Sequence, residues 1–316
     1  MATYLVTGGA GFIGSHVVHE LVRRGEVVRV LDNLSTGRRG NLARVSDQIA
    51  FYEMDICDLG GISRLFEGVD YVVHIAAIPS VARSIAEPLA ANAVNITGTL
   101  NVLLAARDAG VKRLVFAASA AAYGDNPTMP RVETLTPDPL SPYALAKLAG
   151  EYYCRIFNRI YGLETVALRY FNIFGPRQNP DSPYSGVLSK FVATYQRGET
   201  PLIFGDGQQS RDFTYVDNVV DATLKACTVP QAAGKVINVG VGKSYTLNQT
   251  IALLNTIFGR EVAPKYGPPR KGDVLHSLAD ISLARQVLEY EPQVSFEEGL
   301  RRTVAWFRME ASGAGR

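Results

Sequence analysis

The chain has 316 residues, of which 47% are hydrophobic and 20% charged, a composition typical of a soluble enzyme with one large domain or a large domain and a smaller lobe. Its 32 basic and 30 acidic side chains leave a formal net charge of +2, which gives no support to a nucleic-acid partner. No apolar run reaches the roughly 18 uncharged residues that a membrane helix needs, no signal peptide precedes the first strand, and Cys57, Cys154 and Cys227 are too dispersed for a disulfide framework or a metal site. We therefore expect a cytoplasmic protein with no membrane partner.

The first 170 residues alternate short apolar runs with longer helical patterns. Runs that are apolar throughout are typical of strands buried on both faces of a parallel sheet, and their alternation with helices predicts a doubly wound, Rossmann-type α/β sheet. The expected strands are residues 4–6, 28–31, 71–75, 114–118 and 166–170, and the expected helices are residues 13–24, 88–108 and 142–161.

The pattern changes after residue 170. Pro176, Pro180, Pro183 and Gly186 lie close together, and short strands then mix with helices. We expect residues 171–316 to form mainly a smaller α/β lobe, with some segments returning to the large domain and a cleft between the two. The expected elements are a helix at 187–197, a turn at 205–207, a strand at 236–239 and helices at 247–258 and 296–309.

A glycine-rich segment, VTGGAGFIGS at residues 6–15, follows the first strand and opens the first helix. Gly8, Gly11 and Gly14 suit a tight turn, a close approach to a pyrophosphate and helix-on-strand packing, and the helix N-terminus offers its N–H groups to phosphates. Asp32 ends the second strand, where a carboxylate accepts hydrogen bonds from ribose hydroxyls and repels a 2′-phosphate. The segment therefore favours NAD, although Arg38 and Arg39 nearby keep NADP open.

A second group of residues suggests proton chemistry. Tyr143 and Lys147 lie four residues apart on a predicted helix, so they share one face. A free phenol has a pKa of about 10, and a neighbouring ammonium together with the positive nicotinamide ring would lower this pKa toward that of a useful base. Ser119 ends the fourth predicted strand, at the edge where a parallel sheet presents its ligands, and its hydroxyl could bind the reacting oxygen.

Together these motifs resemble the extended short-chain dehydrogenase/reductases, the NAD-dependent epimerase/dehydratase family. The glycine segment with Asp32, then Ser119, the Tyr143/Lys147 pair and LRYFN at 168–172 occur in the family's order over the whole chain. Within it the chain looks most like the UDP-glucose 4-epimerases and UDP-N-acetylglucosamine 4-epimerases, through DNLS at 32–35, GDGQQSRDF at 205–213 and GDVLHSLAD at 272–280.

The resemblance implies roles for particular residues. Tyr143 would be the base, assisted by Ser119 and Lys147. The cofactor NAD would be bound by Gly8, Gly11, Phe12, Ile13, Gly14, Asp32, Asn33, Asp55, Ile56, Ala76, Ala77, Asn95, Tyr143, Lys147 and Tyr170. The UDP-sugar substrate would be bound by Ser119, Tyr143, Asn172, Gly186, Val187, Phe204, Arg211, Arg270, Asp273 and Ser277. Several of these have plainer readings: a polar surface loop at Asp55 and Ile56, lobe core at Phe204, and surface arginines at 211 and 270.

Ser277 matches the point where epimerases restricted to unsubstituted hexoses carry a bulky tyrosine. A serine leaves room for a 2-acetamido group, so UDP-GlcNAc and UDP-GalNAc are expected to fit beside UDP-glucose and UDP-galactose. Ala120 and Ala121 replace hydroxyl residues common in relatives, which argues against a strong preference for acetylated sugars. The family also implies a homodimer formed by the helices near residues 92–108 and 142–161.

Three alternatives stay open: a UDP-glucuronate 4-epimerase, a UDP-glucuronate decarboxylase and a non-catalytic nucleotide-binding scaffold. A UDP-glucuronate 4-epimerase differs only in its substrate, and a UDP-glucuronate decarboxylase would need groups that hold a C6 carboxylate, which the sequence does not reveal. A 4,6-dehydratase is disfavoured because the acidic pair it needs before Tyr123-Gly124 is missing. A non-catalytic nucleotide-binding scaffold is disfavoured because Ser119, Tyr143 and Lys147 are all present.

Overall fold

A parallel sheet forms the base of the molecule, and the computed structural model describes residues 1–179, 186–269 and 274–311. Its seven strands lie in the order β11-β6-β5-β4-β1-β2-β3. The chain therefore starts near the middle and winds first to one edge and then to the other, which confirms the doubly wound α/β fold class. The strands are β1 (Thr3–Thr7), β2 (Val27–Asp32), β3 (Ile49–Glu53), β4 (Tyr71–His74), β5 (Arg113–Ser119), β6 (Glu164–Tyr170) and β11 (Val236–Val239).

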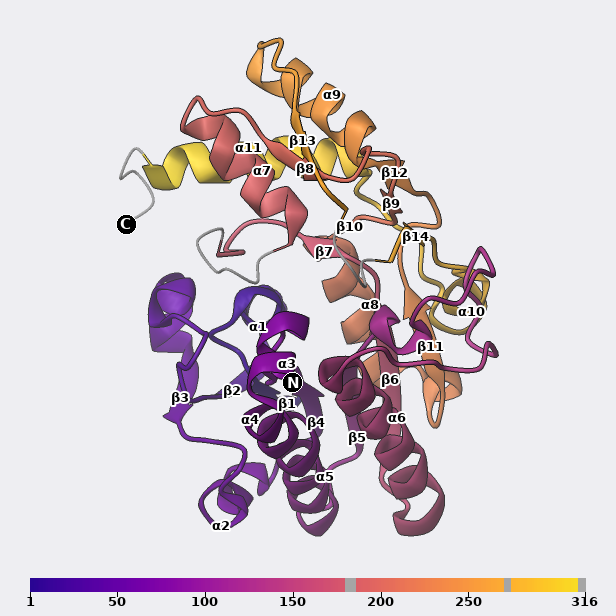
Figure 1. Cartoon of the computed structure of the whole chain (residues 1–316). Helices are drawn as coiled ribbons and strands as arrows, with labels where there is room; N and C mark the ends of the chain where they lie inside the picture. Colours follow the sequence, from indigo (N-terminus) through magenta and orange to yellow (C-terminus); the bar gives the residue numbers. More distant parts are fainter. Residues whose placement is uncertain (180–185, 270–273, 312–316) are drawn as a thin grey trace.

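Helices cover both faces of this sheet, as Figure 1 shows. On one face α1 (Phe12–Arg23) packs against α8 (Val216–Thr228), and on the other α5 (Thr99–Asp108) packs against α6 (Pro142–Tyr161). Neighbouring strand residues such as Leu5 and Val6 belong to the two different apolar clusters that result. Both faces of the strands are thus buried, which is why their sequences are apolar without alternation.

Short helices complete the sheet domain. They are α2 (Leu59–Ile62), α3 (Val81–Ala86), α4 (Pro88–Asn92) and the 3-10 turns Arg39–Gln48, Ser63–Phe66, Ala120–Tyr123 and Pro230–Ala232.

The stretch expected as one helix over residues 88–108 is interrupted. Between α4 and α5 it forms a π-helical turn, Ala93–Gly98. The turn brings the Asn95 side chain to the backbone of Ile78. Its amide oxygen accepts a hydrogen bond from the Ile78 N–H at 2.7 Å, and its NH₂ group donates to the Ile78 carbonyl at 3.1 Å. At Gly98, a Cβ would meet the outer part of the Ile56 side chain at 2.7 Å, so a larger residue there would require Ile56 to shift.

The same stretch corrects the expectation about membrane helices. Pro88–Asp108 is apolar and long enough to cross a membrane by length and composition alone. Half of its most apolar window is buried inside the protein, and its Asn95 and Asn101 side chains bond to the backbone of neighbouring loops. Such packing is typical of a core helix, whose apolar face covers a sheet.

The second half of the chain builds a smaller lobe above the carboxyl ends of the sheet strands, drawn from rose to yellow in Figure 1. Its core includes Phe174, Phe213, Tyr215 and Phe296, which continue the apolar cluster of one sheet face. The Phe174 ring meets the other three edge to face, and Phe213 stacks on Phe296. The elements are β7 (Ile173–Phe174), α7 (Val187–Gln196), β8 (Leu202–Phe204), β9 (Ser210–Arg211), β10 (Thr214–Tyr215), β12 (Tyr245–Thr246), α9 (Leu247–Phe258), β13 (Lys265–Gly267), β14 (His276–Ser277), α10 (Ser282–Leu288) and α11 (Phe296–Ala311).

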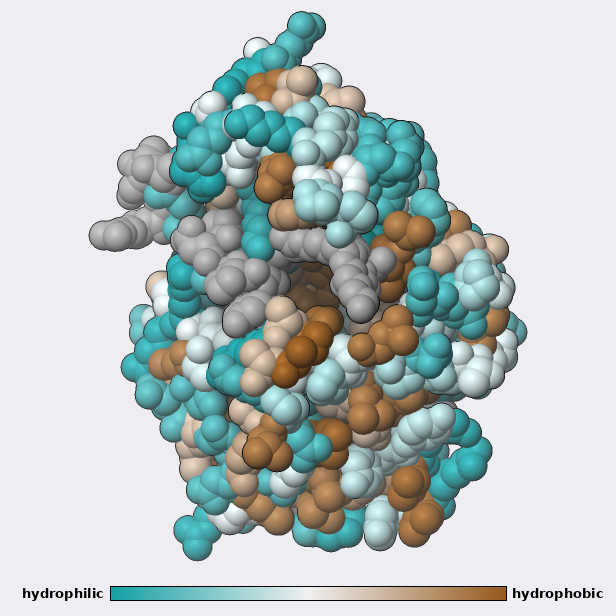
Figure 2. Space-filling view, viewed as in Figure 1, coloured by the Kyte–Doolittle hydropathy of each residue, from teal (hydrophilic) through white to brown (hydrophobic). Residues whose placement is uncertain are grey.

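Two segments of the second half lie on the large sheet. Strand β11 pairs with β6 at the sheet edge, and α8 packs against α1 and against β4, β5 and β6. Helix α8 was not among the expected helices, although Val216, Val219 and Val220 follow helical spacing. Figure 2 shows the surface hollowed between the sheet domain and the lobe.

Candidate active site

The glycine segment forms a tight cradle at the carboxyl end of β1. Gly8 has a φ of 71°, a conformation that side-chain-bearing residues rarely adopt, and a Cβ there would meet the Ala76 backbone nitrogen at 2.7 Å. Helix α1 starts after Gly11, and among the described residues no side chain caps it. The N–H groups of its first turn, which contains Phe12, Ile13 and Gly14, therefore remain available to a phosphate. This geometry fits a dinucleotide.

Asp32 lies beside this cradle and is only 8% exposed. Its carboxylate accepts hydrogen bonds from the backbone N–H groups of Ala10, at 2.9 Å, and Leu34, at 2.8 Å. Burial raises the pKa of Asp32, and these two bonds partly oppose the rise. Nearby, the Asn33 amide donates to Asp55 at 2.8 Å, so the residues expected around the adenosine lie together.

The remaining residues assigned to the cofactor differ in what they offer. Ala76 and Ala77 follow β4 next to Gly8. The Asn95 side chain is already bonded at both ends to Ile78, so it braces the loop that carries the two alanines.

The side chains of Ile56 and Tyr170 are buried in the core. Ile56 is 5% exposed, and the Tyr170 hydroxyl bonds to Thr223 of α8 at 2.8 Å. The Tyr170 phenol is therefore held against α8 by its own hydrogen bond.

Ser119 and Tyr143 meet where β5 ends and α6 begins. Burial raises the pKa of Tyr143, and the nearby Ser119 hydroxyl partly opposes this rise. Desolvation disfavours the phenolate, so the lowering expected from Lys147 and the nicotinamide ring together depends on the charge of the cofactor. The Ser119 hydroxyl also accepts the Ala121 N–H at 3.2 Å, which fixes its position.

Lys147 is anchored to the same strand. Its ammonium donates to the Ala117 carbonyl of β5 at 2.6 Å and lies 4.9 Å from the centre of the Phe116 ring. The residue is 5% exposed, and burial lowers its pKa to about 8. Tyr143 and Lys147 thus share the face of α6 that packs on β5, as their spacing predicts.

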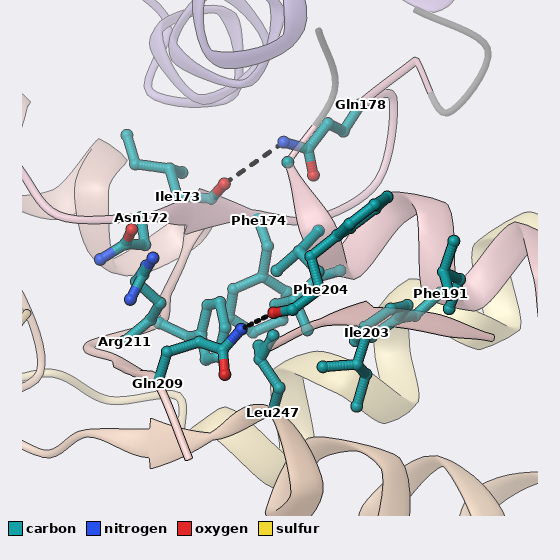
Figure 3. Close-up of a pocket in the computed structure, with 15 residues that line it drawn as sticks. Asn172, Ile173, Phe174, Gln178, Phe191, Ile203, Phe204, Gln209, Arg211 and Leu247 are labelled. Carbon is teal, nitrogen blue, oxygen red and sulfur yellow. Dashed lines mark hydrogen bonds between the residues drawn. The ribbon is translucent and has the colours of Figure 1, made fainter. Parts of the chain in front are cut away.

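A pocket of about 280 Å³ opens in the smaller lobe (Figure 3). Five residues that the resemblance assigned to the substrate line it: Asn172, Gly186, Val187, Phe204 and Arg211. Figure 3 shows the nitrogen ends of Asn172 and Arg211 at one end of the pocket, with aromatic and aliphatic side chains along its length. The pocket therefore combines a polar end with an apolar wall, which is how small-molecule sites are usually built.

Ser277 joins this group through β14, which pairs with the strand of Arg211. The backbone of Asn172 is left-handed, with a φ of 35°. Its side-chain amide donates to the Ser277 hydroxyl at 3.3 Å. Two further expected residues, Arg270 and Asp273, lie outside the described residues.

Several residues at the site were not expected from the sequence. Ser84 of α3 is buried, and its hydroxyl accepts the Tyr143 N–H at 3.0 Å. The Gln209 amide donates to the Phe204 carbonyl at 2.6 Å, and Phe191 and Leu247 complete the apolar wall. Gln209 lies inside the GDGQQSRDF motif and could have been proposed, whereas Ser84 has no such signal.

Comparison with known proteins agrees with this geometry. Residues 4–240 match the NAD dependent epimerase/dehydratase family. A UDP-glucose 4-epimerase from Thermotoga maritima, solved with UDP-glucose, is 44% identical with a TM-score of 0.93, over 98% of this chain and 99% of that one. A UDP-N-acetylglucosamine 4-epimerase from Methanobrevibacter ruminantium, in complex with UDP-N-acetylmuramic acid, is 41% identical with a TM-score of 0.94 and the same coverage.

A third relative carries a different substrate name. A UDP-glucuronate 4-epimerase from Thermodesulfobacterium geofontis is 37% identical over 318 residues, covering 97% of this chain and 96% of that protein. Family match, fold and site geometry lead to one conclusion: the chain belongs to the NAD dependent epimerase/dehydratase family and is an enzyme of the epimerase type with NAD as its cofactor.

Proposed function

We propose that this protein is a UDP-hexose 4-epimerase that interconverts UDP-glucose with UDP-galactose and UDP-GlcNAc with UDP-GalNAc. The observation that carries the proposal is that Ser119 and Tyr143 come together at the carboxyl end of the same sheet that carries the glycine cradle. The pair lies at the carboxyl ends of the sheet strands, where ligands of such folds bind. Residues 1–170 would hold the cofactor, and residues 171–316 mainly the substrate, with β11 and α8 returning to the sheet.

In this proposal Tyr143 removes the proton of the sugar 4-hydroxyl, and Ser119 donates a hydrogen bond to the same oxygen. Bound NAD supplies the redox chemistry, since it accepts a hydride from C4 and returns it to the other face of the 4-keto sugar. Because burial raises the pKa of Tyr143, the phenolate needs positive charge beside it. The Lys147 ammonium, when protonated, and an oxidised nicotinamide ring would provide this charge.

The lobe pocket would hold the nucleotide. Arg211 and Asn172, at its polar end, suit the diphosphate, because a guanidinium keeps its charge and matches phosphate geometry. The Phe204 ring suits the uracil, and Gly186 and Val187 would line the same region. Arg270 and Asp273 are assigned to the substrate by resemblance alone.

One activity panel tests the proposal. The purified protein is incubated separately with UDP-galactose, UDP-GalNAc and UDP-glucuronate, and the C4 epimer of each is measured. We expect turnover of the first two. Turnover of UDP-glucuronate alone would instead support the second candidate, which the Thermodesulfobacterium geofontis relative favours. Turnover of none of the three would contradict both.

Ser277→Tyr should separate the two kinds of hexose. A phenol at this place on β14 would fill the space that a 2-acetamido group needs, so kcat/KM for UDP-GalNAc should fall by roughly 10- to 200-fold. UDP-galactose should keep most of its activity. Ser277→Ala is the control, because it removes the bond to Asn172 without filling the space. Equal losses on both substrates in Ser277→Tyr would refute the role of Ser277 in the pocket wall.

We also propose a homodimer and a cytoplasmic location. Large apolar side chains lie exposed on α6 and on the neighbouring α3 and α4, and hydrophobic patches mark the lower half of Figure 2. Exposed apolar patches of this kind are typical of protein interfaces. The side chains are Ile85, Leu89, Leu145, Tyr152, Ile156 and Ile160.

Ile156→Glu should shift the protein toward monomers, because a carboxylate at an apolar interface loses its hydration without a partner. The measurement is the molar mass by light scattering at several concentrations. Val27→Glu is the control, since Val27 and Ile156 are both 43% exposed and Val27 lies away from α6. A wild-type protein that is monomeric throughout would disprove the dimer.

A further inference from the structure

A buried ion pair lies behind the proposed catalytic residues. Glu151 of α6 and Arg169 of β6 form two parallel hydrogen bonds of 2.8 and 2.7 Å, and their side chains are 3% and 4% exposed. Tyr143, Lys147 and Glu151 follow one another at intervals of four residues, so they form one stripe along α6. The pair therefore ties the stripe that carries the proposed base to β6, the neighbour of β5 in the sheet.

The same arginine reaches the loop that follows Ser119. Its guanidinium lies 4.5 Å from the centre of the Tyr123 ring, and Tyr123 ends the 3-10 turn that Ser119 caps. The Tyr123 hydroxyl in turn donates to Asn238 of β11 at 2.7 Å. Arg169 is thus in contact with α6, which carries Tyr143, and with the turn that follows Ser119.

Stability alone does not account for such a pair. Taking two charges out of water costs several kcal/mol per ion, and well-packed apolar residues are often as stable as a buried pair. A two-pronged guanidinium–carboxylate contact does, however, fix distance and direction, which an apolar contact does not.

We propose that Glu151 and Arg169 are positioning residues that hold α6 and the Ser119 turn in register, so that the Tyr143 and Ser119 hydroxyls meet on one substrate oxygen. This inference rests on the proposed function of that site. Neither residue touches the substrate; both act through α6 and Tyr123.

The chain contains a control pair that joins β6 to its neighbour β5. Arg113 of β5 donates to Glu164 of β6 at 2.6 and 2.9 Å, with a guanidinium that is 5% exposed. These two residues are partners at the opposite end of the strands, away from Ser119. Substitutions in this second pair should lower the free energy of unfolding without changing the positions of Ser119 and Tyr143.

The test compares Arg169→Lys with Arg113→Lys in the NAD-loaded protein. Lysine keeps the positive charge but cannot form the two parallel hydrogen bonds of the guanidinium, so α6 and the Ser119 turn are no longer held in one geometry. For Arg169→Lys, kcat should fall by roughly 10- to 100-fold while KM for the UDP-hexose changes little. The pKa of Tyr143 should rise, because the Ser119 hydroxyl, whose interaction lowers this pKa, is no longer held near the phenol. Arg113→Lys should leave both values unchanged.

The pKa of Tyr143 is followed as tyrosinate absorbance, with the same protein carrying Tyr143→Phe as the baseline. This reading needs no substrate, so it tests the positioning role even if the wild type turns over no UDP-hexose and the proposed function fails. Glu151→Asp and its control Glu164→Asp keep every charge. If Arg169→Lys does not fold, the same measurements on these two variants test the positioning role. Unchanged kcat and Tyr143 pKa in a folded Arg169→Lys or Glu151→Asp, or equal changes in the control variants, would overturn the proposal.

Discussion

Replacing Tyr143 by phenylalanine should lower kcat at least about 100-fold while NAD and UDP-hexose still bind, because general base catalysis contributes roughly 10²- to 10⁴-fold. Only the phenol oxygen is removed. The backbone N–H that Ser84 accepts is kept, so the start of α6 stays in place. The variant should therefore fold normally and lose only proton transfer.

The measurement is steady-state turnover of UDP-galactose together with NAD content and UDP binding. Tyr152→Phe is the matched control, since this tyrosine lies on the same helix and is 48% exposed. It should leave kcat unchanged. Turnover near the wild-type level in Tyr143→Phe would show that another group removes the proton.

Gly8→Ala should weaken NAD binding. An added Cβ would collide with the Ala76 backbone at 2.7 Å, and neither side of that contact is a flexible side chain. The loop must open to relieve the collision, and the closed cradle is the form that suits the pyrophosphate. Overpacking of this kind costs about 1–3 kcal/mol, which corresponds to roughly a 5- to 150-fold rise in Kd for NAD.

Gly25→Ala provides the control for backbone strain. Gly25 has a φ of 75°, close to the 71° of Gly8, but a Cβ there would meet nothing within 4 Å. Both variants place an alanine in a left-handed backbone conformation, which lowers stability. Only Gly8→Ala also brings a Cβ into contact with the Ala76 backbone. Calorimetric titration with NAD measures the difference. Similar Kd values for the two variants would mean that the contact with Ala76 does not shape the cradle.

Local patterns in the sequence predicted the sheet and much of the site. The strand around Val6, the glycines that follow it and the Tyr143/Lys147 spacing each depend on residues close in the chain. For that reason they could be read without a structure. The bounds of α6 agree with the predicted 142–161 because Pro142 opens the helix and Gly162 closes it.

Contacts between distant segments could not be read in this way. Asn172 and Ser277 are 105 residues apart, and Ser84 and Tyr143 are 59 apart, so no spacing rule connects them. The pKa of Tyr143 was predicted to fall because its charged neighbour is visible in sequence and its burial is not. The helical pattern of α8 was present, but nothing local indicates that it packs on a sheet formed earlier in the chain.

The return of β11 and α8 to the large sheet has a consequence for biosynthesis. Strand β6 and the apolar face under α8 stay uncovered until the ribosome has made residues 216–239. A nascent chain cut near residue 170 would present an open strand edge, which is a template for aggregation. The sheet is therefore incomplete until residues 216–239 are made, and we expect the two halves of the chain to fold as one cooperative unit.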